Sequence, residues 1–161
     1  MRLIPYILYL LLIALHQVIL ADVTSVYGAT INLAAFLVLA VAVYKTEVAV
    51  AWFGFAAGIM LAAGLPLQMG WHALVLVVLG MAAFHVRERL NLDSLYAKLL
   101  LMFVGILLHN VLVILISQAN GFLYLLWSSA LPGAIYTSLV AMVYFAFKEG
   151  LITYQRLKTI F

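Results

Sequence analysis

The stretch GLPLQMGWHAL, Gly64–Leu74, separates two long apolar runs and carries no formal charge. In a soluble protein a turn of this kind is exposed to water and usually carries charged side chains. The composition of the chain explains the difference, because 69% of the 161 residues are apolar and only 8% are charged. A globular domain is about half apolar and about a quarter charged. So few polar side chains cannot cover a soluble surface, and the chain is predicted to be an integral membrane protein.

Outward from this stretch, the sequence divides into six runs close to the roughly 20 apolar residues that a membrane-spanning helix needs. We predict one all-α membrane domain, a compact bundle of six transmembrane helices with a juxtamembrane tail over 148–161. The second and third helices are short, so a small tilt or a place inside the bundle would accommodate them. The predicted spans are Leu3–Ala21, Ala29–Tyr44, Val48–Ala63, Met69–Val86, Leu95–Ser117 and Leu131–Phe147.

The first run also resembles a signal peptide, because Arg2 precedes a strongly apolar segment. His16 and Gln17 interrupt that segment, and no cleavage site of small residues follows at the usual distance. We therefore expect a retained first helix.

The basic residues fall on one side of this arrangement. With six spans, the eight Lys and Arg residues lie on the same face of the membrane, and Asp22 is the only charged residue on the other face. Basic residues mark the cytoplasmic side, so both termini are expected inside. A five- or seven-helix arrangement would scatter these charges over both faces. The opening stretch is then an outward-facing turn, with Trp71 as an anchor at the outer interface.

A second uncharged break, SQANGFLYLLWSSALPG, runs from Ser117 to Gly133. Its apolar part, Phe122–Trp127, is too short to span a membrane. We expect an interfacial helix along the outer surface. The alternatives are irregular backbone that dips into the bundle, or an apolar lid or docking surface for a partner. Pro132 suits the first turn of the sixth helix.

Several classes of function are disfavoured by what the sequence lacks. The predicted spans hold no Asp, Glu, Lys or Arg well inside, and the Gly-x-Ser-x-Gly and His-Glu-x-x-His signatures are missing. The chain has no cysteine, which removes disulfides and thiolate metal sites. The basic residues are spread singly, so the lipid bilayer and not nucleic acid is the expected partner. We predict a non-enzymatic protein without cofactor or metal.

Histidine is the residue type left that could carry chemistry. In the predicted topology His16, His72 and His109 lie in the outer half of the membrane, and Asn110 follows the last of them. Three imidazoles at a similar depth could form a metal site or a polar ligand pocket. We favour neutral histidines that are hydrogen-bonded to neighbouring helices. The expected partners of these histidines are Gln17, Asn32 or Asn110. His72 is then a polar strut that holds the outer turn against the first or the fifth helix.

Small residues recur every four positions in the third predicted helix, at Gly54, Gly58 and Ala62. This spacing lets two helix backbones approach closely. Packing inside the bundle is the preferred interpretation, and a surface for another membrane protein is the alternative. In the tail, apolar side chains at near-helical spacing predict a short helix on the inner leaflet; they are Leu151, Tyr154, Leu157 and Phe161.

These features resemble the bacterial rod shape-determining MreD family. The resemblance covers the length, the six helices, the inside termini, and a glycine-rich third helix that leads through a turn to a Gly-x-His-Ala-Leu start of the fourth helix. A basic inner turn with Arg87 and Arg89 follows. One departure is at Leu61-Ala62-Ala63, where the family often has an aspartate. The matching residues are Gly54, Gly58, Gly70, His72, Ala73 and Leu74.

The resemblance implies a scaffold or regulatory subunit of the cell-elongation machinery in the bacterial cytoplasmic membrane, where peptidoglycan is made for the rod shape. Its implied partners are the bitopic protein MreC and, through it, the peptidoglycan polymerase–transpeptidase pair. Homo-oligomerisation is left open. The family also implies a fold similar to the substrate-binding subunits of energy-coupling-factor vitamin transporters. That similarity gives the alternative function, a solute-binding membrane subunit with an outward pocket lined by His16, His72 and His109.

Overall fold

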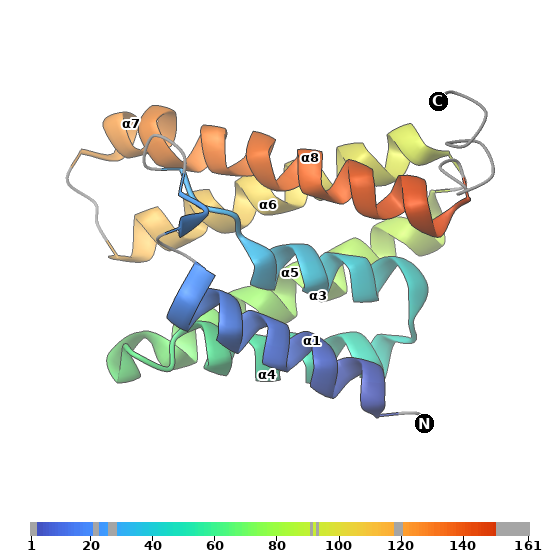
Figure 1. The fold of residues 1–161 in the computed structure, drawn as a ribbon, viewed down its shortest axis with the longest axis horizontal. Coiled ribbons are helices and arrows are strands. Elements are labelled where there is room, and N and C mark those ends of the chain that lie inside the picture. Colours follow the sequence, from blue (N-terminus) through green and yellow to red (C-terminus); the bar gives the residue numbers. More distant parts are fainter. Residues whose placement is uncertain are drawn as a thin grey trace.

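The computed structural model describes residues 3–20, 23–25, 29–90, 92, 94–117 and 121–150. Within these residues the chain is all-helical and forms six helical rods, as predicted (Figure 1). The predicted helix in the tail lies outside the described residues. The rods are α1 (Ile4–Leu15) with the π-helix η1 (His16–Leu20), α3 (Leu33–Tyr44), α4 (Glu47–Leu61), η2 (Pro66–Gln68) with α5 (Met69–Arg89), α6 (Leu95–Ser117), and α7 (Phe122–Leu125) with η3 (Leu126–Ala130) and α8 (Leu131–Lys148).

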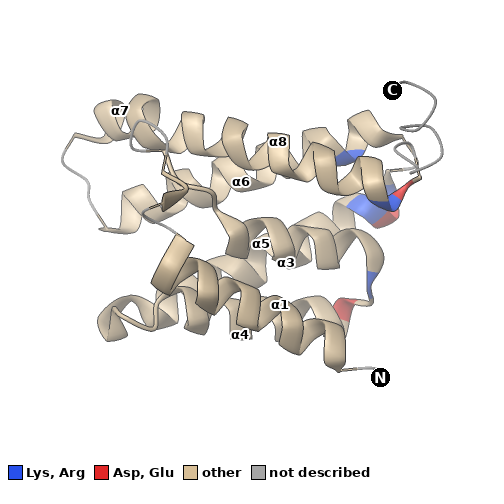
Figure 2. Ribbon diagram, in the orientation of Figure 1, with Lys and Arg blue, Asp and Glu red and all other residues tan. Residues whose placement is uncertain are grey.

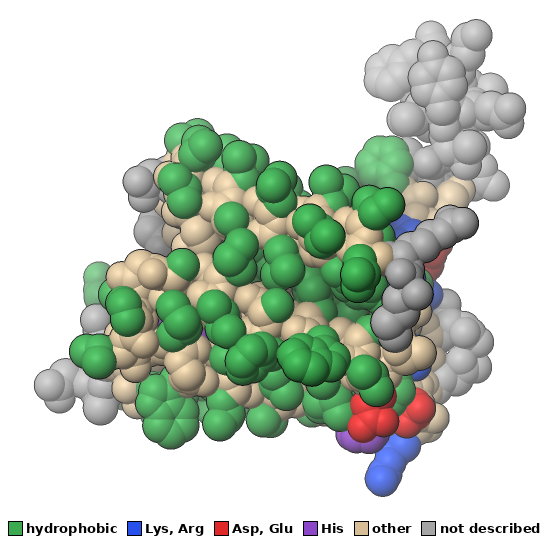
Figure 3. Space-filling view, turned by 90° about the horizontal axis from the view of Figure 1, so that it is seen from below, with side chains coloured by type: hydrophobic (Ala, Val, Ile, Leu, Met, Phe, Trp, Pro, Cys, Tyr) green, Lys and Arg blue, Asp and Glu red, His purple; other side chains and the backbone are tan. Residues whose placement is uncertain are grey.

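Three of these rods are long and apolar enough to cross a membrane: Pro66–Arg89, Leu95–Ser117 and Phe122–Lys148. The other three, which contain α1, α3 and α4, are apolar but shorter. Large apolar side chains are exposed along the rods, and Figure 3 shows one face of the molecule covered by them. An exposed apolar surface of this extent suits contact with lipid and not with water. The structure therefore supports the prediction of a membrane protein.

The short helix α3 lies at the centre of the bundle. Every residue from Ala34 to Val43 is buried, and α3 packs against α4, α5 and α6. A helix that is apolar on all sides is stable when other elements cover all of those sides. Neighbouring rods thus cover all sides of α3. This place inside the bundle is one of the two that the sequence analysis gave for a short span.

The helix α3 begins later than the predicted span, which started at Ala29. Asn32 is the N-cap, and its side-chain oxygen accepts a hydrogen bond from the backbone N–H of Ala35 at 3.1 Å. Asparagine is among the best residues for this position, because it satisfies a donor that the first helical turn leaves free. Ala29–Ile31 therefore remain outside the helix.

The closest helix pair is the hairpin of α4 and α5. A Cβ atom at Gly58 would lie 2.3 Å from Cα of Ala73, and one at Gly54 would lie 3.1 Å from the carbonyl oxygen of Leu76. Ala62, the C-cap of α4, is also buried. The small residues Gly54 and Gly58 thus face α5 of the same chain and let the two backbones touch.

The last rod differs from the prediction of a separate interfacial helix over Phe122–Trp127. Here α7 continues through the π-helix η3 into α8, so the rod runs from Phe122 to Lys148. Pro132 explains the wide turn, because proline has no N–H for the carbonyl four residues earlier and its ring crowds that carbonyl. A π-turn before the proline relieves this conflict without breaking the rod.

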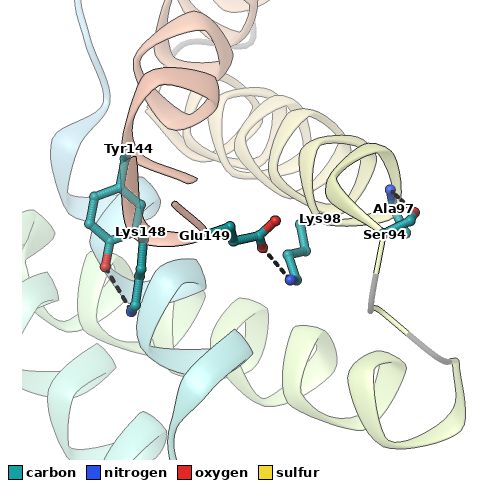
Figure 4. A network of polar contacts seen from close by, with 6 residues as sticks. All are labelled: Ser94, Ala97, Lys98, Tyr144, Lys148 and Glu149. Carbon is teal, nitrogen blue, oxygen red and sulfur yellow. Dashed lines mark hydrogen bonds and ion pairs between the residues drawn. The ribbon is translucent and has the colours of Figure 1, made fainter. Parts of the chain in front are cut away.

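The charged residues of the described ranges gather at one end of the bundle, where α1 begins and α8 ends (Figure 2). Arg87 donates hydrogen bonds to the carbonyl oxygens of Ala42 and Lys45, both at 2.9 Å, and so covers the C-terminus of α3. Lys98 of α6 pairs with Glu149, which follows α8 (Figure 4). This charged end links α3, α5, α6 and the end of α8.

Lys148 adds a second contact at the charged end. Its ammonium donates to the hydroxyl of Tyr144 at 3.0 Å (Figure 4). The same ammonium lies 3.3 Å from the ring centroid of Tyr44. A cation over an aromatic face is attracted by the ring quadrupole. The last turn of α8 is therefore tied to the end of α3.

Candidate functional site

A polar pocket lies at the end of the bundle opposite to the described charges. Its volume is about 350 Å3. It is bounded by the segment before α3, the turn between α4 and α5, the second half of α6 and the end of η3. Apolar walls with a few converging polar groups are typical of small-molecule sites, whose volumes start at about 300 Å3. Its polar lining residues include Asn32, His72, His109 and Asn110.

Asn32 is the centre of the hydrogen-bond network. Because its Oδ1 accepts from the Ala35 N–H, the orientation of the amide is determined and Nδ2 faces α6. Nδ2 lies 2.7 Å from Nδ1 of His109 and donates to Oδ1 of Asn110, also at 2.7 Å. Both amide hydrogens are thereby used. One asparagine caps α3 and joins it to two side chains of α6.

The same segment is joined to α8. The backbone N–H of Asn32 donates to Oγ1 of Thr137 at 3.0 Å, and that hydroxyl donates to the carbonyl of Gly133 at 2.7 Å. A Cβ atom at Gly133 would lie 3.2 Å from the carbonyl oxygen of Thr30, so the glycine lets non-helical backbone approach the helix. Irregular backbone at membrane depth is tolerated where protein surrounds it and pairs its polar groups. α8 lies against this backbone at Gly133 and pairs the N–H of Asn32 through Thr137.

Asn110 extends the network to the π-helix η3. Its Nδ2 donates to the carbonyl oxygen of Ala130 at 3.1 Å. Asn110 thus joins α6 to the end of η3.

The hydrogen bond from Asn32 also determines the tautomer of His109. Nδ1 of His109 accepts a hydrogen bond from Asn32, so in the neutral ring the hydrogen is on Nε2. His109 is 2% exposed, and its Nε2 is buried without a partner among the described residues. His109 therefore carries one buried N–H donor that the described protein groups do not satisfy.

His72, at the head of α5, lies beside His109. The two ring centroids are 6.5 Å apart, and Nδ1 of His72 is also buried without a partner in the described part of the chain. The predicted strut between His72 and another helix is thus not seen at this atom. Both His72 and His109 line the polar pocket.

The predicted outer cluster is therefore divided. The structure brings His72, His109 and Asn110 together, whereas His16 lies in η1, with Nε2 3.5 Å from Oγ1 of Thr24. Its neighbour Gln17 lines the pocket instead. In the described ranges no group of three His, Cys, Asp or Glu residues is placed to hold a metal ion.

Two residues of the network were not among the predicted site residues. Asn32 was expected only as a partner for a histidine, although an asparagine before an apolar run is a helix-start signal. Thr137 carries no signal in the sequence, because its role depends on backbone from a distant segment.

Comparison with protein-family models, curated proteins and solved structures gave no match. The fold and the site together define a class: an all-helical protein of membrane type, charged at one end and with a polar pocket at the other.

Proposed function

We propose that the chain is a non-enzymatic scaffold or regulatory subunit of the bacterial cell-elongation machinery. One observation carries the proposal: residues that resemble the MreD family meet in space. Gly58 of α4 faces the backbone of His72 and Ala73 at the head of α5. These residues form one packed unit, which is what a structural motif requires and an accidental string of small residues does not.

The proposed topology has six spans in the cytoplasmic membrane, with both termini inside. An even number of rods brings the end of α8 back to the end of the bundle where α1 begins (Figure 1). The described Lys and Arg residues lie at that end (Figure 2), and the positive-inside rule assigns it to the cytoplasm. The three shorter rods would complete the crossing with the help of non-helical ends such as Ala29–Asn32.

The proposed partners are an MreC-like bitopic protein and other membrane proteins of the elongation complex. The α4–α5 hairpin is closely packed and also contacts the buried α3, and such close packing suits a scaffold that holds partners at defined positions. The apolar outer surface is open to helices of other membrane proteins as well as to lipid.

Co-purification tests this function. The tagged full-length chain is extracted from native membranes in mild detergent, and the retained proteins are identified by mass spectrometry. The proposal expects an MreC-like protein together with the peptidoglycan polymerase–transpeptidase pair. An ATPase module in their place would contradict it. Light scattering of the same particle measures whether the chain associates with itself.

A second candidate function is that of a solute-binding subunit of a vitamin-type transporter. The polar pocket favours it, because His72, His109 and Asn110 line about 350 Å3 of space. This candidate expects the ATPase module in the co-purification experiment.

A further inference from the structure

The inference concerns an apolar groove between α1 and α4. Its volume is about 290 Å3, and none of the described residues that line it is charged. The side chain of Trp52 is 70% exposed on one wall, whereas Phe53 is buried and lies against Tyr6, with ring centroids 6.0 Å apart. Such a groove on the apolar outside of a membrane protein suits a hydrocarbon chain.

A charged hollow of about 900 Å3 adjoins this groove. Tyr6 lines both, and Glu47 of the charged hollow directly precedes Val48 of the groove. Both α1 and α4 begin at the charged end of the bundle, so the groove extends from the charged hollow along the two helices (Figure 1). Figure 3 views the bundle from the side on which α1 and α4 lie in Figure 1, and there acidic side chains border the apolar surface. An apolar groove that ends in a charged hollow matches the two parts of a phospholipid.

The charged residues that line the hollow are of both signs. Lys45 and Arg87 are cations at neutral pH, whereas Glu47 and Glu88 are carboxylates. Arg87 is half-buried and the other three are exposed, so a ligand from the membrane surface can reach them. Nη1 of Arg87 makes the two hydrogen bonds to the end of α3, which leaves further N–H donors of its guanidinium. Glu88 also lies 3.7 Å from Nδ1 of His85, an exposed contact of the kind that contributes little.

This balance of charge selects among headgroups. A phosphate alone would meet two carboxylates as well as two cations, and like charges repel. A headgroup with a phosphate and a primary ammonium gives each sign a partner, because the phosphate accepts from cations and the ammonium donates to carboxylates. A choline headgroup has the same charges but no N–H to donate.

We propose that the groove and the charged hollow together bind a phospholipid with a primary ammonium headgroup, that is, phosphatidylethanolamine. One acyl chain lies in the groove, the phosphate meets Lys45 and Arg87, and the ammonium meets Glu47 and Glu88. The proposal concerns this surface alone, so it holds for either proposed function and for either orientation of the chain in the membrane.

The test is a competition among three lipids with the same acyl chains. The full-length protein in dodecylmaltoside, freed of lipid, receives an equimolar mixture of dioleoyl phosphatidylethanolamine, phosphatidylcholine and phosphatidylglycerol. Native mass spectrometry then measures how much of each lipid the protein retains. Because the acyl chains are identical, burial in the groove cancels and the ratio reports the headgroup.

Two sets of variants assign the effect to this surface. Ala49→Trp fills the groove, whereas Ala82→Trp adds the same side chain at an exposed position of α5 that lines neither the groove nor the charged hollow. The double variant Glu47→Gln, Glu88→Gln removes both carboxylates of the hollow and leaves its cations. Thermal unfolding checks that each variant remains folded. The comparison of the three lipids on the wild type is decisive even where a variant does not fold.

The expected result on the wild type is a preference for phosphatidylethanolamine of about threefold to tenfold over each of the other lipids, as a few exposed ionic hydrogen bonds provide. Ala49→Trp loses the retained lipid and Ala82→Trp keeps it. In the double variant the preference passes to the anionic phosphatidylglycerol. Equal retention of the three lipids by the wild type, or no retention at all, would overturn the proposal. Unchanged retention in folded Ala49→Trp, or an unchanged preference in the folded double variant, would overturn it too.

Discussion

At the scale of single residues, the polar pocket depends on Asn32. This side chain caps α3 with its oxygen and supplies two donors to α6 with its nitrogen. Its backbone N–H adds a bond to α8. Hydrogen bonds between helices contribute about 0.6–2 kcal/mol each in membrane proteins, so the network matters for stability as well as for the shape of the pocket.

Asn32→Asp separates the two roles of the side chain. Aspartate caps helices as well as asparagine does, but it cannot donate to His109 and Asn110. Two buried acceptors would then face a carboxylate, at a cost of about 1–3 kcal/mol or more. We expect a clear fall in the unfolding midpoint in detergent. If Asn32→Asp were as stable as the wild type, Asn32 would stabilise the protein only through the cap of α3 and not through the hydrogen bonds that it donates.

The two pocket histidines differ in what their loss leaves behind. His109→Leu leaves a donor of Asn32 unpaired, and we expect a loss of about 1–3 kcal/mol in the free energy of unfolding. His72→Leu removes a ring whose Nδ1 has no partner in the described part of the chain, so stability should change little. Denaturant unfolding of both variants measures the difference. Equal losses in the free energy of unfolding for the two variants would contradict this prediction and would indicate a stabilising hydrogen bond from His72.

At the scale of elements, the contact between α4 and α5 has the least room. A Cβ atom at Gly58 would meet backbone atoms of α5 at 2.3–2.7 Å, and backbone cannot move aside as a side chain can. At Gly80 the nearest atoms are side-chain methyls of Val38 and Val50. At Gly70, in the first turn of α5, nothing lies within 4 Å.

These three glycines form a graded series. Gly58→Ala is expected to destabilise by about 1–3 kcal/mol or more, because it forces two backbones apart. Gly80→Ala should cost less, and Gly70→Ala should be neutral or stabilising by up to about 1 kcal/mol. The measurement is the unfolding midpoint of each variant in the same detergent. Equal unfolding midpoints for Gly58→Ala and Gly70→Ala would contradict the close contact between α4 and α5.

At the same scale, the sequence predicts some features well and others poorly. The all-α class follows from long apolar runs, which only helices satisfy in a membrane. The start of α3 was misplaced, because Ala29 and Ile31 are apolar like the helix that follows and only the cap at Asn32 marks the boundary. The union of α7 with α8 was missed, because Pro132 favours a helix start and a π-turn leaves no local signal.

The site was harder to predict than the helices. His109 and Asn110 follow from the rarity of polar residues in apolar helices. Their bonds to Asn32 join positions that are 77 and 78 residues apart, and no local pattern encodes such a distance. The separation of His16 from the other histidines has the same cause, because depth in the membrane does not determine which helices are neighbours.

At the scale of the whole molecule, the bundle has two unlike ends. One end carries the described charges and ties α3, α5, α6 and the end of α8 together, and the other carries the neutral pocket. In the proposed topology, which follows the positive-inside rule, the charged end is cytoplasmic. The pocket, the turn Gly64–Leu74 and the outer positions of both histidines all depend on this orientation.

Single-cysteine labelling tests that orientation most directly, because the natural chain has no cysteine. Leu67→Cys places a thiol in the turn before α5, where the side chain is 96% exposed, and Thr46→Cys places one at the charged end between α3 and α4. A membrane-impermeant maleimide is applied to spheroplasts, in which the cytoplasmic membrane is intact and open to the reagent. The account predicts labelling of Leu67→Cys in intact cells and of Thr46→Cys only after the membrane is permeabilised. The reverse pattern, or equal labelling of both positions in intact cells, would contradict it.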